Sequence, residues 1–160
     1  MARFVKAEED SAKVGFPPPF IYLGMLLLGL LADWLLGLTL PLGQPARMIA
    51  FVGLFALGGV FGFPAMARFK RAGTNLEPWK ASSTIVREGV YRFTRNPMYL
   101  GMALLYLALA QGLASVGALV LLPVLIAVIQ TQVIAREERY LEAKFGQDYL
   151  SYKASVRRWL

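Results

Sequence analysis

The chain has 160 residues, of which 57% are apolar, and the apolar residues form long runs separated by short charged stretches. This layout is typical of a polytopic membrane protein, because a soluble domain of this size interleaves polar residues along each element. The chain contains neither cysteine nor histidine, which excludes disulfides and thiolate catalysis and removes the usual general base, so no metal site is expected. The net charge of +7 flanks hydrophobic runs, so we expect contact with membrane lipids and no nucleic-acid partner.

Four membrane-spanning helices are expected. The first two apolar runs, 20–40 and 48–66, each have close to the ~20 residues that cross ~30 Å of hydrocarbon. The third apolar region is too long for one crossing and predicts two antiparallel helices, 98–113 and 116–134, with a tight turn near 112–116. Only helices and closed barrels satisfy the backbone in lipid, and the alternation of barrel strands is missing from the sequence. The predicted fold class is therefore an all-α polytopic membrane bundle.

The basic residues predict the orientation of this bundle. Three precede the first run, seven lie in the loop 68–97, six lie in the tail 135–160, and Arg47 is the one on the other side. By the positive-inside rule, both termini, the loop and the tail face the cytoplasm. The compact chain is expected to be a single membrane-embedded domain, 1–160, in a bacterial cytoplasmic membrane.

The loop before the third apolar region is rich in charged and turn-forming residues. Pro97 disfavours helix at Asn96 and is tolerated in the first turn, so a helix is expected to begin at Pro97. Backbone donors at that helix start, with Arg95 beside them, would suit an anionic group.

The tail begins with the Glu137 and Glu138 pair between two arginines, and apolar or aromatic residues then recur at three- and four-residue steps. This pattern predicts an amphipathic helix over the membrane surface or the mouth of the bundle, broken near Gly146. Tyr149 and Tyr152 are expected as interfacial aromatic residues. Spacing alone leaves open whether the glutamates bind a cationic ligand group or pair with arginines.

Two strings carry a resemblance to a known family. EGVYRFTRNPMYLG at 88–101, followed after the hairpin by EERYLEAKFGQDYLSYKASVRRW at 137–159, resembles the isoprenylcysteine carboxyl methyltransferase and phospholipid methyltransferase superfamily. The resemblance covers 73–160, and the first two spans match only in hydropathy. It implies S-adenosylmethionine as cofactor, held on the cytoplasmic side, and a lipophilic or lipid substrate that enters between helices.

The resemblance also implies the site residues. The arginine of the family's RxP motif falls on Arg95, and with Glu138 it is the expected catalytic residue. The residues expected to bind the cofactor are Tyr91, Arg95, Asn96, Pro97, Tyr99, Leu100, Glu137 and Glu138. We hypothesise that Arg95 steers an anionic acceptor or the cofactor carboxylate, while one of the glutamates binds the cofactor amino or ribose groups. Many relatives have histidine where Asn96 stands, which argues against a prenylcysteine substrate more than against the cofactor.

The acceptor and two other functions stay open at this point. Methyl transfer to a carboxylate needs no base, whereas an amine must lose a proton, for which Glu137, Glu138 or a tyrosine is available. The alternatives are a nicotinamide-dependent reductase of the sterol reductase type and a non-catalytic lipid-binding membrane protein. The sequence does not predict the oligomeric state.

Three features inside the spans call for their own interpretation. Asp33 lies toward the outer end of the first span and is expected to reach the interface rather than to serve a buried role. Gly58 and Gly62 form a GxxxG pair, which predicts close helix packing. Gln130 and Gln132 are expected either to bond between helices or to touch the ligand.

Overall fold

The computed structural model describes residues 7–160, which form a bundle of helices without a β-strand in that range. The predicted all-α membrane bundle is thereby confirmed. In chain order the elements are α1 (Pro18–Leu36), α2 (Gln44–Arg71), the 3₁₀ turn η1 (Gly89–Arg92), α3 (Pro97–Gly112), α4 (Val116–Val128), the π-helical η2 (Ile129–Ile134), α5 (Ala135–Phe145) and α6 (Gln147–Ser155).

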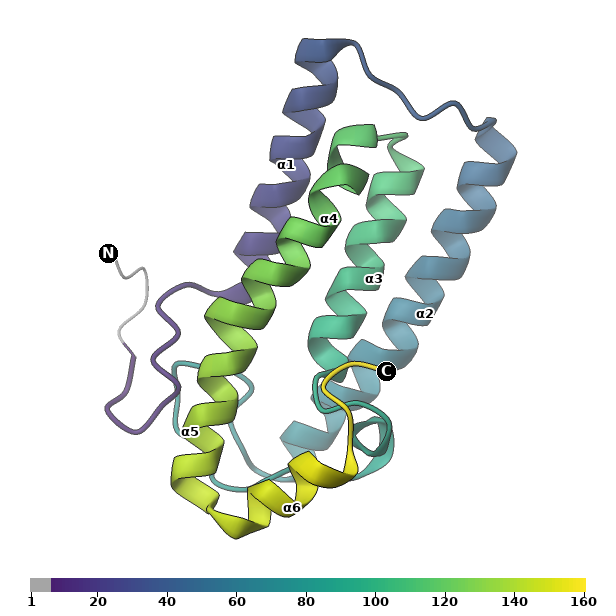
Figure 1. Ribbon diagram of the computed structural model, residues 1–160. Coiled ribbons are helices and arrows are strands. Elements are labelled where there is room, and N and C mark those ends of the chain that lie inside the picture. The colour runs from purple at the N-terminus through teal and green to yellow at the C-terminus, as the bar shows by residue number, and fades with distance from the viewer. Residues whose placement is uncertain (1–6) are drawn as a thin grey trace.

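The α3–α4 hairpin lies between the first two helices (Figure 1). α2 packs most extensively against α3, and α1 packs against α4. α4, η2 and α5 follow one another without a break, and α6 then crosses the end of the bundle where the chain also terminates (Figure 1). The long loop between α2 and α3 lies at this same end, so both motif-bearing segments meet there (Figure 1).

The outer surface of the bundle is suited to lipid. Three helical stretches, Pro18–Leu36, Gln44–Arg71 and Val116–Phe145, are long and apolar enough to cross a membrane, and α3 is a shorter apolar helix. Large apolar side chains point outward, and Trp34 and Ile49 are 78% and 75% exposed. Water would penalise this surface, whereas hydrocarbon solvates it. The chain is therefore a membrane protein.

Several helix ends differ from the hydropathy limits. α1 ends at Leu36 rather than near residue 40, because Gly37 adopts φ 64° and closes the helix with its N–H on the Asp33 carbonyl. α2 continues to Arg71, beyond the predicted end at residue 66. Its last turn carries Arg68, Lys70 and Arg71, which are favourable near the negative end of the helix dipole. Hydropathy marks the part of a helix that lies in hydrocarbon, and this helix extends beyond that part.

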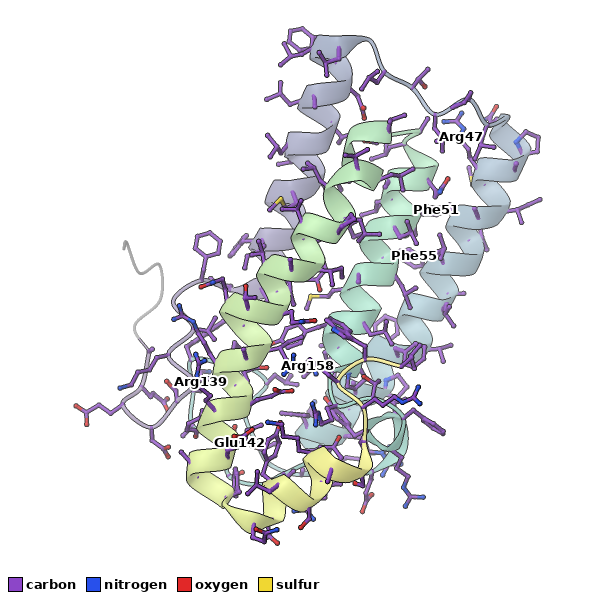
Figure 2. The ribbon with its side chains drawn as sticks, viewed as in Figure 1. Arg47, Phe51, Phe55, Arg139, Glu142 and Arg158 are labelled. Carbon is purple, nitrogen blue, oxygen red and sulfur yellow. The ribbon has the colours of Figure 1, made fainter. Side chains whose placement is uncertain are left out.

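The predicted close approach at the GxxxG pair is confirmed, and its partner is Gly101 on α3. A Cβ added at Gly101 would lie 2.9 Å from the Gly58 carbonyl oxygen and 3.0 Å from the Gly62 nitrogen. The backbones of α2 and α3 therefore meet through glycine on both sides. Farther along the same pair of helices, Phe51 and Phe55 point from α2 toward α3 (Figure 2).

The expectation for Asp33 is wrong. Its side chain is buried between α1 and α4, where Oδ1 accepts a hydrogen bond from the Gly117 N–H at 2.7 Å and Oδ2 accepts one from the Ser115 hydroxyl. Ser115 in turn accepts from the Ala118 N–H at 3.0 Å and so caps α4. The turn after α3 brings the free N–H groups of α4 to α1, so the carboxylate finds its donors inside the bundle.

Candidate functional site

The segment before α3 is tied to the end of the chain. α3 begins at Pro97, as predicted, with Asn96 at the N-cap, although the Asn96 side chain does not cap the helix. Instead its Nδ2 donates to the Arg158 carbonyl at 2.9 Å, and the Thr94 hydroxyl donates to the same oxygen at 3.1 Å. The Arg95 N–H donates to the Arg157 carbonyl at 2.9 Å. The last residues therefore form a strap, 156–160, across the start of α3.

A buried ion cluster lies beneath this strap. Arg95 donates through Nη2 to Glu138 Oε1 at 2.9 Å and through Nη1 to the Lys153 carbonyl at 2.7 Å. Arg158 approaches Glu138 from the other side, with Nε–Oε1 and Nη2–Oε2 distances of 3.0 and 2.5 Å. Figure 2 shows Arg158 reaching inward from the strap. The side chains of Arg95 and Glu138 are 8% and 6% exposed, and the neighbouring Glu138 carboxylate raises the pKa of Arg158. The cluster of two cations and one anion carries a net positive charge.

Glu137 has a different partner from its neighbour. Its Oε1 accepts a hydrogen bond from the Tyr99 hydroxyl at 2.6 Å, and the Tyr99 carbonyl accepts one from the Tyr22 hydroxyl at 3.0 Å. Successive helix residues point about 100° apart, so the two glutamates face different walls of the same space. From the sequence we considered the two glutamates as a pair. In the structure Glu138 pairs with two arginines, and Glu137 accepts a hydrogen bond from Tyr99.

A cavity of about 790 Å³, including its open mouth, joins these groups. We call it the polar cavity because several charged side chains lie in its wall. Residues from α3, α5, α6 and the loop after α2 contribute to its wall. Of the residues predicted from the sequence, those in the wall are Tyr91, Arg95, Asn96, Pro97, Tyr99, Glu137 and Glu138. Leu100 is not in the wall.

Two buried donors in the wall lack a protein partner. Within the described residues, Arg95 Nε and the Tyr91 hydroxyl are enclosed without a hydrogen bond. Burial raises the pKa of Tyr91, so its hydroxyl stays protonated and can donate at neutral pH. Unpaired buried donors are rare in folded proteins, which makes these two atoms candidates for binding an acceptor group of a ligand.

The expectation that Tyr149 and Tyr152 lie at the membrane interface is wrong. Both are buried, with exposures of 3% and 6%, and both line the cavity from α6. The Tyr152 hydroxyl donates to the Tyr91 carbonyl at 2.7 Å, and burial raises the pKa of Tyr152 to about 12. Gly146, with φ 54°, breaks the tail helix as predicted and turns this aromatic face over the mouth of the bundle.

An apolar groove adjoins the cavity. Its volume is about 1000 Å³, including its open side, and it runs between α2, α3 and the start of α1. Its wall consists of Pro18, Pro19, Phe55, Gly58, Gly59, Gly62, Phe63, Met66, Leu76, Glu77, Pro78, Trp79, Met98, Tyr99, Gly101, Met102 and Leu105. Five of these residues also line the polar cavity, namely Leu76, Glu77, Pro78, Met98 and Tyr99. The cavity and the groove therefore share one wall.

The segment before α1 closes the cavity from the side. Ala12 lies in the wall, and Asp10 forms an ion pair with Lys144 while its carbonyl accepts from the Tyr140 hydroxyl at 3.2 Å. Glu8 accepts from the Ala81 N–H at 2.8 Å, which ties the segment to the loop after α2. Nothing in the hydropathy pattern indicated this role, because the segment is short and polar.

The sequence did not lead us to predict that Arg158 and Trp159 bind other segments of the bundle through their side chains. Both stand inside the second motif string, which was the available signal. The Trp159 indole N–H donates to Gln130 Oε1 at 3.0 Å, so Gln130 bonds between segments, while Gln132 accepts from Arg136 at 3.1 Å on the surface.

Comparison with known proteins identifies the family. The family described as phospholipid methyltransferase matches residues 46–148, more than half of the chain and all of the predicted site residues. An uncharacterized protein of Haemophilus influenzae is 48% identical over 67 residues, an alignment that covers 39% of this chain and 100% of that protein. No solved structure matches. The chain belongs to the phospholipid methyltransferase family.

Proposed function

We propose that the protein transfers a methyl group from S-adenosylmethionine to a lipid acceptor at one face of the membrane. Membership of a methyltransferase family already makes it an enzyme that acts on lipids. The observation that carries the finer proposal is that a polar cavity and an apolar groove share a wall at Tyr99. One space suits a charged, water-soluble cofactor, and the other suits the chains of a lipid.

The groups in the polar cavity fit the cofactor. Arg95 Nε and the Tyr91 hydroxyl are free to donate to a carboxylate, and the Glu137 carboxylate suits an ammonium or sulfonium group. Tyrosine rings in the wall favour a nearby cation as well. When bound, S-adenosylmethionine would supply an electrophilic methyl group.

The roles assigned to the arginine and glutamates follow from their partners. Glu138 is occupied by Arg95 and Arg158, so we assign it to holding Arg95 in place. Arg95 Nε has no hydrogen-bond partner among the described residues, so it can donate to the cofactor carboxylate. Tyr99 lies in the wall that the two spaces share, and Glu137 accepts a hydrogen bond from its hydroxyl on the cavity side. These two groups are therefore the best placed to contact the cofactor and the acceptor.

The groove is assigned to the acyl or prenyl chain of the acceptor. Glycines at Gly58, Gly59 and Gly62 leave room along α2, and the groove has an open side. A lipid lying there would bring its headgroup to Tyr99 without leaving the membrane. We further propose that this end of the bundle faces the cytoplasm, since the basic loop and tail are both at this end.

The test uses the full chain in nanodiscs containing equal parts of phosphatidylethanolamine, phosphatidylglycerol and phosphatidylserine. Incubation with methyl-labelled S-adenosylmethionine should produce a lipid that carries the label, detected by mass spectrometry. In a separate measurement, the protein purified in detergent should have a higher melting temperature with S-adenosylmethionine than with NADPH, because a ligand stabilises the state that it binds.

Glu137→Gln is the informative variant, and Glu142→Gln, on the same helix but outside the cavity wall, is its control. Loss of the cofactor-induced shift in Glu137→Gln alone is the expected result. Stabilisation by NADPH instead would favour the reductase alternative, and stabilisation by neither compound would favour a non-catalytic lipid-binding role.

A further inference from the structure

The wall between the polar cavity and the apolar groove contains a carboxylate. Glu77 lines both spaces, and among the described residues of the groove it is the one with a charged side chain. The other groove residues are apolar, glycine or proline, apart from Tyr99. A charge in this position faces the place where the headgroup of a lipid in the groove would lie.

Glu77 is held in a defined position. Its Oε1 pairs with Lys80 Nζ at 2.9 Å, and the Lys80 N–H donates to the Glu77 carbonyl at 3.0 Å. The Trp79 carbonyl accepts from the Glu8 N–H at 2.9 Å, which fixes the same turn to the segment before α1. The hydrogen bond from Lys80 lowers the pKa of Glu77, so the carboxylate is ionised at neutral pH. The pair uses Oε1, so Oε2 can accept from a second donor.

The charges around the shared wall favour a cationic headgroup. Arg95 and Arg158 are both engaged with Glu138, and Lys80 lines the cavity but not the groove. Glu137, like Lys80, lines the cavity and not the groove. A headgroup that reaches this wall from the groove therefore meets the Glu77 carboxylate first, which attracts a protonated amine.

We infer that Glu77 determines the headgroup specificity of the enzyme by binding the cationic amine of the acceptor lipid whose chains occupy the groove. The bound amine then passes its proton to the Glu137 carboxylate before its nitrogen attacks the methyl group. This inference rests on the proposed function, since it takes the groove to hold the acceptor. Lys80 positions the carboxylate and faces the anionic part of a zwitterionic headgroup. A lipid with a carboxylate or glycerol headgroup gains nothing from Glu77.

The test compares Glu77→Gln with the wild type and with Glu88→Gln in the full chain. Glu88 is also a loop glutamate paired with a basic residue, Arg68 at 2.8 Å, but it lines neither space. Binding of dioleoyl phosphatidylethanolamine and dioleoyl phosphatidylglycerol is measured by native mass spectrometry without cofactor, so the readout does not depend on catalysis. Transfer of labelled methyl groups to the two lipids is measured in parallel.

The wild type and Glu88→Gln should bind the ethanolamine lipid about fivefold to tenfold more tightly than the glycerol lipid, as expected for one charge-assisted contact. Glu77→Gln should lose this preference and leave the affinity for the glycerol lipid unchanged. A preference that survives in Glu77→Gln, or methyl transfer to a carboxylate lipid alone, would overturn the inference. A preference that depends on Glu77, without methyl transfer to any lipid, would support headgroup recognition and overturn the proposed function instead.

Discussion

Arg158 and Glu138 form a two-point ion pair, with Nε–Oε1 and Nη2–Oε2 distances of 3.0 and 2.5 Å. This pair joins the strap, 156–160, to the first turn of α5. The same carboxylate also binds Arg95 at 2.9 Å. One anion therefore connects three segments that are far apart in the sequence, and the shape of the cavity depends on it.

Replacing Glu138 by glutamine should destabilise the protein strongly. Two guanidinium groups would lose their counter-ion, and breaking a buried pair in this way costs about 3–5 kcal/mol. Glu142→Gln removes a carboxylate that pairs with Lys153 and is 30% exposed, and it should cost at most about 1 kcal/mol. Thermal unfolding of both variants in one detergent measures the difference. Equal melting temperatures would show that Glu138 is not the centre of the cluster.

Tyr99→Phe should weaken cofactor binding and also lower stability. The variant removes the hydroxyl that donates to Glu137 at 2.6 Å, a contact to a charged group worth about 1.5–3 kcal/mol to the folded protein. Because it also leaves Glu137 without its positioning partner, we expect a roughly tenfold rise in Kd for the cofactor. Tyr106→Phe is the matched control on the same helix, because its hydroxyl donates to the Ala118 carbonyl at 2.8 Å away from the cavity. Calorimetric titration with S-adenosylmethionine should distinguish the two. Similar affinities in both variants would remove Tyr99 from the site.

Gly62→Leu should block the groove and spare the helix packing. A Cβ at Gly62 meets no atom within 4 Å, and the residue lines the groove, so a larger side chain would enter that space. Gly53→Leu adds the same side chain to the same helix where there is also open space but no groove. Methyl transfer should fall at least about tenfold in Gly62→Leu, if the lost lipid contacts amount to 1.4 kcal/mol or more, and stay near the wild-type rate in Gly53→Leu. Unchanged activity in both would show that the acceptor does not use the groove.

Asp33→Ala should lower stability at the end of the bundle opposite the site. The change leaves the Gly117 N–H and the Ser115 hydroxyl without their acceptor, at about 1–3 kcal/mol for each buried group. Cofactor affinity measured well below the new melting temperature should be unaffected. An unaltered melting temperature would indicate that the carboxylate reaches the interface, as hydropathy alone suggested.

The sequence predicted the parts of this protein that have a local signal. Long apolar runs mark the helices, Pro97 marks the start of α3, and Gly146 marks the break in the tail. The two motif strings correctly indicated which segments meet, because Arg95 and Glu138 are in direct contact.

The sequence could not predict which side chains form hydrogen bonds and ion pairs with each other. Glu137 and Glu138 are adjacent in the chain, and only the direction of each side chain from the helix assigns one to Tyr99 and the other to arginines. Asp33 finds its donors 82 and 84 residues away, which no pattern in its own span reveals. No local signal in the sequence distinguishes Glu77 from the other residues of the loop, and only the structure shows that the cavity and the groove meet beside it.

The π-helical segment Ile129–Ile134 sets the rotation of α5 about its axis, and with it the directions of both glutamates. A π-turn holds one residue more than the α-helical turn that it replaces, and it is best regarded as a one-residue insertion into a regular helix. Removing that extra residue would rotate everything after it by about 100° about the helix axis. Both glutamates would then be out of phase with Tyr99 and Arg95, although every side chain needed for the site would still be present in the chain.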